Sequence, residues 1–147
     1  MSTHNEETQV RAVIEDWALA LGAKDTRRVL SHYGKDVVQF TLAPPLVSDE
    51  GAAELKVWFD SWQGPIGYEL RDLIITARSD IAFGHGLTRL TGTSTGGEKT
   101  DLWFRLTLGL RKIGSAWKII HAHESVPFYM DGSYRAAIDL KPQGVKQ

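Results

Sequence analysis

The chain contains no cysteine among its 147 residues. Disulfide bridges, a thiolate nucleophile and cysteine-ligated zinc are therefore excluded, and the composition suits a reducing compartment. No apolar run approaches the roughly 18 residues of a membrane helix, and Met1–Gln9 lacks the apolar stretch of a signal peptide. We therefore expect a cytoplasmic protein with no membrane partner.

Neither sign of charge dominates the sequence. The formal net charge is -1, from 17 Lys and Arg against 18 Asp and Glu, and the basic residues form no run. A nucleic-acid partner is not expected, because it would need a basic surface. The chain has no phosphate loop and no Gly-x-Ser-x-Gly nucleophile motif, and Gly84-x-Gly86 is an isolated pair that permits curvature or a bulge in a strand. We therefore predict no cofactor.

The chain is rich in aromatic residues, with five Trp, five Phe and four Tyr. Aromatic side chains build cores, and they also line sites for apolar ligands. The length and the 42% of hydrophobic residues suit one globular domain. We expect a single domain over 1–147, with a core at about 6–128 and a loose tail at 141–147.

Three helices are expected in the first half. Apolar residues recur at helical spacing over 6–21, and Asp25 can cap a second, short helix that stops near Gly34. A short strand over 37–42 follows. A third helix capped by Ser48 or Asp49 would end at Gly64-Pro65.

The second half changes to the period of strands. Residues 68–78, 81–93, 100–111 and 116–127 predict four strands with turn-like breaks, which is typical of an antiparallel meander. A last helical turn is expected over 133–140. The order predicts an α+β fold, in which a cone-shaped curved antiparallel sheet of about five to six strands packs on three N-terminal helices around an internal apolar pocket.

Polar candidates gather on the last strands. Alternation places His121 and His123 on one face of the last strand. On the preceding strand it places Arg105 and Thr107 on one face, and a row of leucines over 102–110 on the other. One hairpin register brings Arg105 beside His123, whereas a loop one residue shorter pairs the histidines with the leucines. The leucine row forms either the core or a dimer interface.

Under the first register several polar residues converge on the pocket, where Arg supplies fixed charge and His a proton near neutral pH. The predicted catalytic residues are His121, His123, Arg105 and His85. The predicted ligand-binding residues are Arg89, Trp103, Phe40, Trp58, Trp62, Tyr33 and Trp17. His-x-His also occurs in metal sites, but Glu124 points away from the pair on a regular strand, and no metal site is predicted.

The pattern Trp103-x-Arg105-x-Thr107, followed by Trp117-Lys118-Ile119 and His121-x-His123-x-Ser125, resembles the SnoaL-like and ketosteroid-isomerase-like families of the nuclear transport factor two-like superfamily. The resemblance implies a cystatin-like roll and a cofactor-independent isomerase, cyclase or dehydratase. It places the isomerase base at Thr41 and the isomerase tyrosine at Trp17, so the steroid-isomerase mechanism is not expected. Arg89-Leu90-Thr91 resembles the association domain of calcium/calmodulin-dependent kinase, which implies that Arg89 faces inward, toward a carboxylate.

Three hypotheses follow for function. The first is a small-molecule-binding protein, acting as an enzyme through His acid–base chemistry on a hydrophobic ligand that bears a carbonyl or a carboxylate. The second is a non-catalytic binding or oligomerisation module, with a homodimer formed through the sheet face. The third is a structural His and Arg network with no ligand.

Overall fold

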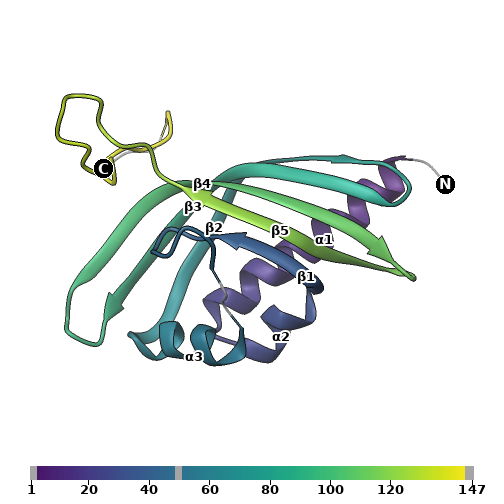
Figure 1. Cartoon of the computed structure of the whole chain (residues 1–147), viewed down its shortest axis with the longest axis horizontal. Helices are drawn as coiled ribbons and strands as arrows, with labels where there is room; N and C mark the ends of the chain where they lie inside the picture. The colour runs from purple at the N-terminus through teal and green to yellow at the C-terminus, as the bar shows by residue number, and fades with distance from the viewer. Residues whose placement is uncertain (1–2, 49–50, 145–147) are drawn as a thin grey trace.

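The computed structural model describes residues 3–48 and 51–144. Three helices and one short strand precede four long strands (Figure 1). The elements are α1 (Thr3–Gly22), α2 (Thr26–Ser31), β1 (Tyr33–Phe40), α3 (Ala52–Asp60), β2 (Trp62–Ala77), β3 (Ile81–Ser94), β4 (Lys99–Ile113) and β5 (Ala116–Ser125). The predicted α+β class is confirmed, with helices from the first half packed on a curved sheet.

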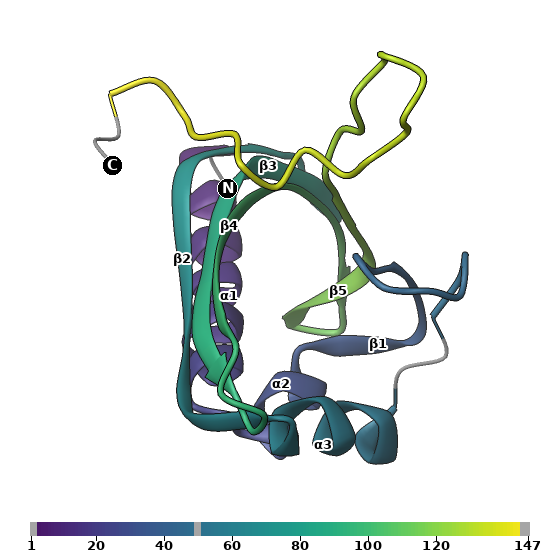
Figure 2. The same ribbon diagram turned by 90° about the vertical axis from the view of Figure 1, so that its left-hand side faces the viewer.

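The five strands form one sheet in the order β1-β5-β4-β3-β2. Strands β2 to β5 make the predicted antiparallel meander, whereas β1 joins the edge of β5 in parallel. Figure 2 shows the sheet bent over α1, with α3 across one end and β1 facing the long strands. The bend brings side chains from distant strands toward one another.

A bulge in β2 contributes to this bend. The pairing of β2 with β3 shifts between Arg71 and Ile74, and Asp72 adopts a positive φ of 58°. Gly86 lies opposite the bulge, where a Cβ atom would come within 2.9 Å of the carbonyl oxygen of Arg71. A side chain at position 86 would therefore force the bulged strand away, which agrees with the interpretation of this glycine from the sequence.

The helix boundaries differ in part from the prediction. Asp25 caps α2 as expected, because its side chain accepts a hydrogen bond from the backbone N–H of Arg28 at 3.2 Å. The cap of α3 is Gly51 rather than Ser48, and Asp49 lies outside the described residues. The prediction that α3 ends at 64–65 is wrong, because pairing with β3 draws the chain into β2 from Trp62 onward.

The leucine row of β4 lies in the core. Leu106, Leu108 and Leu110 are at most 1% exposed, and they belong to the same core cluster as Ile14 of α1. These leucines are therefore unavailable as a dimer interface, which settles the alternative that the sequence leaves open.

The segment after β5 crosses the outer face of the sheet. The predicted helical turn over 133–140 is wrong, because Asp131 accepts a hydrogen bond from the backbone N–H of Ser133 and starts a turn, with Gly132 at a φ of 90°. An isolated bridge joins Phe128 to Ala136. Residues 145–147 of the expected loose tail lie outside the described residues. Within the described part of the tail, the carbonyl oxygen of Gln143 accepts a hydrogen bond from Arg71 at 2.8 Å. No helix in the described part of the chain has the length and apolarity to cross a membrane.

Candidate functional site

A cavity of about 200 Å³ opens on the concave side of the sheet. Helix α1 forms one wall, β1 and the residues after it form another, and α3 lies at the end (Figure 2). Its lining is mostly apolar and aromatic: Trp17, Leu21, Tyr33, Gln39, Phe40, Thr41, Leu42, Ala43, Trp58, Tyr68, Leu90, Phe104, Ala122 and Glu124. Such a surface suits a small apolar ligand with one polar end.

The polar centre of the cavity is a tyrosine–glutamate pair. The hydroxyl of Tyr68 on β2 donates a hydrogen bond to Oε2 of Glu124 on β5 at 2.7 Å. In the sheet order, β3 and β4 separate these strands, so three interstrand spacings lie between them, about 14 Å along the sheet. The pair forms only because the sheet curls.

Tyr68 is a fixed hydrogen-bond donor. Burial raises its pKa well above the ordinary value, and the neighbouring negative charge of Glu124 and their hydrogen bond raise it further. The phenol therefore stays protonated at neutral pH. The rings of Trp17 and Phe104 pack around it with centroids 5.6 and 5.8 Å away, which holds the donor in place.

The remaining polar groups of the lining are neutral. Trp17 donates from Nε1 to the hydroxyl of Tyr33 at 3.0 Å, Gln39 is buried, and the Thr41 hydroxyl donates to the carbonyl oxygen of Ala43 at 3.2 Å. Trp17 and Thr41 occupy the positions that the resemblance assigns to the isomerase tyrosine and base, and both line the cavity. Neither can serve as a proton acceptor near neutral pH, so Glu124 is the one carboxylic acid side chain of the described lining.

The aromatic residues named from the sequence divide into two groups. Trp17, Tyr33, Phe40 and Trp58 line the cavity. Trp62 lies at the start of β2 beside Trp58, and Trp103 lies on the outer face. Neither of these two tryptophans lines this cavity, and ligand binding by all six aromatic residues stays a prediction.

The histidines and arginines lie on the face opposite the cavity. The predicted register is wrong by two residues: Thr107 pairs with His123, and Arg105 pairs with Ser125. A shift between Gly109 and Leu110 also breaks the alternation along β5, so that Ile119 is buried while His123 points outward. Arg105, His121 and His123 do share a face, but it is the outer one, where His85 and Arg89 also lie.

Each of these outer residues has a local structural partner. Nδ1 of His121 lies 2.8 Å from the carbonyl oxygen of Val38, and the ring of Phe40 packs edge-on against both His121 and His123. The ring of His85 stacks on Phe83, and Arg105 donates from Nε to the Ser125 hydroxyl at 3.2 Å.

The inward orientation expected for Arg89 is wrong. Its guanidinium makes two hydrogen bonds to Asp101, of 2.9 and 2.8 Å, and lies over the ring of Trp103. Catalysis by the outer histidines and arginines stays a prediction. Within 3–48 and 51–144, no group of three His, Asp or Glu residues is placed to hold a metal ion.

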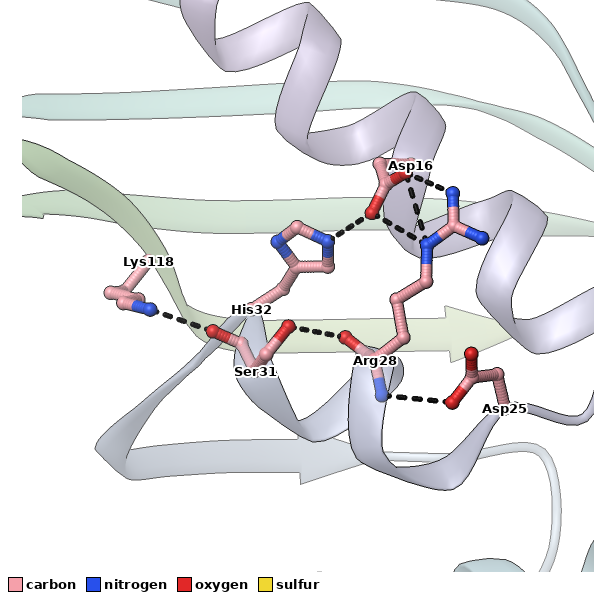
Figure 3. A network of polar contacts seen from close by, with 6 residues as sticks. All are labelled: Asp16, Asp25, Arg28, Ser31, His32 and Lys118. Carbon is pink, nitrogen blue, oxygen red and sulfur yellow. Dashed lines mark hydrogen bonds and ion pairs between the residues drawn. The ribbon is translucent and has the colours of Figure 1, made fainter.

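A polar network of residues that do not line the cavity links the first two helices to β5 (Figure 3). Asp16, the residue before Trp17, accepts hydrogen bonds from Arg28, and the one from Nε measures 3.0 Å. The Asp16 carboxylate also lies 2.6 Å from Nε2 of His32. The Arg28 and His32 hydrogen bonds hold the pKa of Asp16 well below its ordinary value. Lys118 of β5 donates to the carbonyl oxygen of Ser31 at 2.6 Å. The network therefore joins α1, α2 and β5.

Sequence reasoning missed Tyr68, Gln39 and Glu124. A usable signal was present for Glu124, because it alternates out of phase with His121 and His123. Once the leucine row is assigned to the core side of β4, the same assignment places Glu124, paired with Leu106, on the cavity side of β5. Tyr68 carried no comparable signal, since its contact depends on the curl of the sheet.

Comparison with known proteins agrees with this architecture. The model of the SnoaL-like domain matches residues 10–129. An NTF2-like protein of unknown function from Pseudomonas putida KT2440 is 32% identical, with a TM-score of 0.84, and the match covers 97% of this chain and 99% of that one. The chain therefore belongs to the SnoaL-like family, within the NTF2-like proteins.

More distant structures share the fold alone. A ketosteroid isomerase-like protein from Erwinia carotovora atroseptica SCRI1043 is 23% identical, with a TM-score of 0.66 over 82% of this chain and 95% of that one. A protein with a cystatin-like fold from Caulobacter vibrioides is 16% identical, with a TM-score of 0.68 over 82% and 89%. Among curated proteins, no sequence matches this chain.

Proposed function

We propose that the chain is a small-molecule-binding protein that acts as a cofactor-independent isomerase- or lyase-type enzyme, with Glu124 as the proton acceptor. The observation that carries this proposal is one carboxylate, oriented by Tyr68, inside an aromatic cavity. A carboxylate fixed beside a bound apolar ligand can take a proton from it, and the apolar walls limit competing water. The structural neighbour described as ketosteroid isomerase-like shares this fold.

The proposal moves the acid–base centre away from the histidines predicted from the sequence. His121 and His123 lie on the other side of the sheet, whereas Glu124 lines the cavity. Tyr68 keeps the carboxylate in one orientation. The cytoplasmic location expected from the sequence stays a prediction.

Proton abstraction can be tested before the substrate is known. We expect the protein to bind a small ketone such as acetophenone and to speed the exchange of its methyl hydrogens in D₂O, followed by NMR. Glu124→Gln should abolish the exchange and retain the fold. Glu98→Gln, in the turn between β3 and β4, is a matched control that should exchange like the wild type. Exchange that is equal in the wild type and Glu124→Gln would overturn this role for Glu124.

A homodimer through the outer sheet face is a second proposal. Ile74 and Phe83 on that face are 56% and 48% exposed, although both are large apolar side chains. A second copy would cover them. We expect a dimer by light scattering at micromolar concentration, and Phe83→Glu should produce a folded monomer. A wild-type monomer would contradict the proposal.

A further inference from the structure

The charge of the cavity is one-sided. Glu124 supplies a carboxylate, and none of the described residues that line the cavity is a lysine, arginine or histidine. Six aromatic side chains line the same cavity: Trp17, Tyr33, Phe40, Trp58, Tyr68 and Phe104. A ligand in this space therefore meets one carboxylic acid side chain and several aromatic rings.

The nearby basic residues are engaged elsewhere. Arg28 pairs with Asp16 on the outside of α1 (Figure 3), and Arg89 pairs with Asp101 on the outer face. Lys24 donates from Nζ to the carbonyl oxygen of Trp62 at 2.8 Å. A carboxylate in the cavity would find no counter-charge among its described lining and would be repelled by Glu124. The described lining thus lacks a counter-charge for a carboxylate, one of the two ligand groups predicted from the sequence; the other, a carbonyl, needs none.

We propose that the ligand of this cavity is a small organic cation, an amine or a quaternary ammonium compound, whose apolar body packs among the aromatic rings and whose nitrogen faces Glu124. Aromatic faces attract a positive charge of either kind, and a carboxylate accepts a charge-assisted hydrogen bond from the N–H of a protonated amine. The inference rests on the proposed ligand-binding function, but it does not require turnover.

The Tyr68 hydroxyl strengthens this arrangement. Its hydrogen bond fixes Oε2 of Glu124, so the carboxylate loses little freedom when a cation binds. The negative charge of Glu124 also contributes to the raised pKa of Tyr68, as expected where the local potential is negative. A cation would relieve this potential.

The size of the cavity limits the ligand. A cavity of about 150 Å³ can hold benzene, so the volume of about 200 Å³ here fits one aromatic ring with a short substituent. Benzylamine, which is positively charged at pH 7, is therefore a suitable probe. Benzyl alcohol is its neutral counterpart, and benzoate is its anionic one.

The test is to measure the affinity of the wild type for these three probes at pH 7, by calorimetry and by ligand-detected NMR. We expect benzylamine to bind about tenfold to a hundredfold more tightly than benzyl alcohol, and benzoate to bind most weakly. Glu124→Gln should remove the preference for the amine, whereas Glu98→Gln should keep it. Ala122→Leu, which narrows the cavity and retains the carboxylate, should weaken benzylamine and benzyl alcohol together.

The outcomes separate this inference from the proposed function. Equal affinities for the amine and the alcohol, with both weakened by Ala122→Leu, would overturn the cationic ligand and leave the binding pocket standing. A preference for benzylamine that survives Glu124→Gln would place the cation elsewhere and overturn the inference. Failure of all three probes to bind at millimolar concentration would count against both proposals.

Discussion

Glu6 makes a buried contact whose removal should be costly. Glu6 lies at the start of α1, and the residue is 2% exposed. Its carboxylate accepts a hydrogen bond from Nε1 of Trp117 at 3.1 Å. The ammonium group of Lys112 lies 3.4 Å from its Oε1. Glu6 therefore joins the first helix to the hairpin of β4 and β5. We expect Glu6→Ala to destabilise the protein strongly.

The size of the loss follows from the groups left without a partner. The buried indole N–H of Trp117 would lose its acceptor, at about 1–3 kcal/mol. Lys112 keeps 19% of its side chain exposed, so water can replace part of its lost ion pair, and this contribution falls below the roughly 3–5 kcal/mol of a fully buried pair. We expect a total of about 3 kcal/mol, or a fall in Tm of about 9 °C at this chain length.

Urea and thermal unfolding followed by circular dichroism would measure this loss. Glu15→Ala, on the exposed side of the same helix, is the matched control and should cost under about 0.5 kcal/mol. In a Trp117→Phe background, Glu6→Ala should cost clearly less, because the indole donor is already gone. A loss from Glu6→Ala that equals that of Glu15→Ala would refute the reasoning.

Three further predictions concern stability. Leu108→Ala should cost about 2–5 kcal/mol in urea unfolding, since Leu108 is fully buried in the core, and a loss below 1 kcal/mol would contradict this placement. The pKa of Tyr68 is raised on folding, so the wild type should lose stability as pH rises above about 10. The Tm of Tyr68→Phe, measured between pH 9 and 11, should fall less than that of the wild type. The pKa of Asp16 is lowered on folding, so the wild type should be more stable than Asp16→Asn at pH 7, and this difference in stability should shrink as pH falls below 3.8. Salt at 1 M should also reduce the difference. A difference in stability that is constant with pH would refute the stabilising role of the network.

Local signals in the sequence predicted much of the fold. The apolar spacing in α1, the Asp25 cap and the turns of the meander are properties of neighbouring residues, and each led to the observed element. The errors arose where distant parts of the chain decide. Trp62 is in a strand because β3 is available to pair with it, and the segment from Ser133 turns back upon the sheet.

The candidate site was predictable only in part. The spacing of Trp17 and Trp58 on their helices indicated that they could face the sheet, and both line the cavity. The shift near Gly109 buries Ile119 although it alternates in phase with the outward His121 and His123, and a shift of this kind has no signature in the alternation of residues. The pairing of Tyr68 with Glu124 joins residues 56 positions apart, across two other strands, and so requires the curvature of the whole sheet.

The position of Glu124 has a consequence for how such proteins diverge. Its backbone is fixed by pairing with Leu106, and the leucine row and the buried contact of Glu6 lie outside the cavity lining. A single codon change at position 124 would therefore replace or remove the carboxylate of the cavity without touching those contacts, and its direct loss would be the acceptor of the Tyr68 hydroxyl. A lineage built on this chain could acquire a new class of ligand in one mutational step, at the cost of one hydrogen bond.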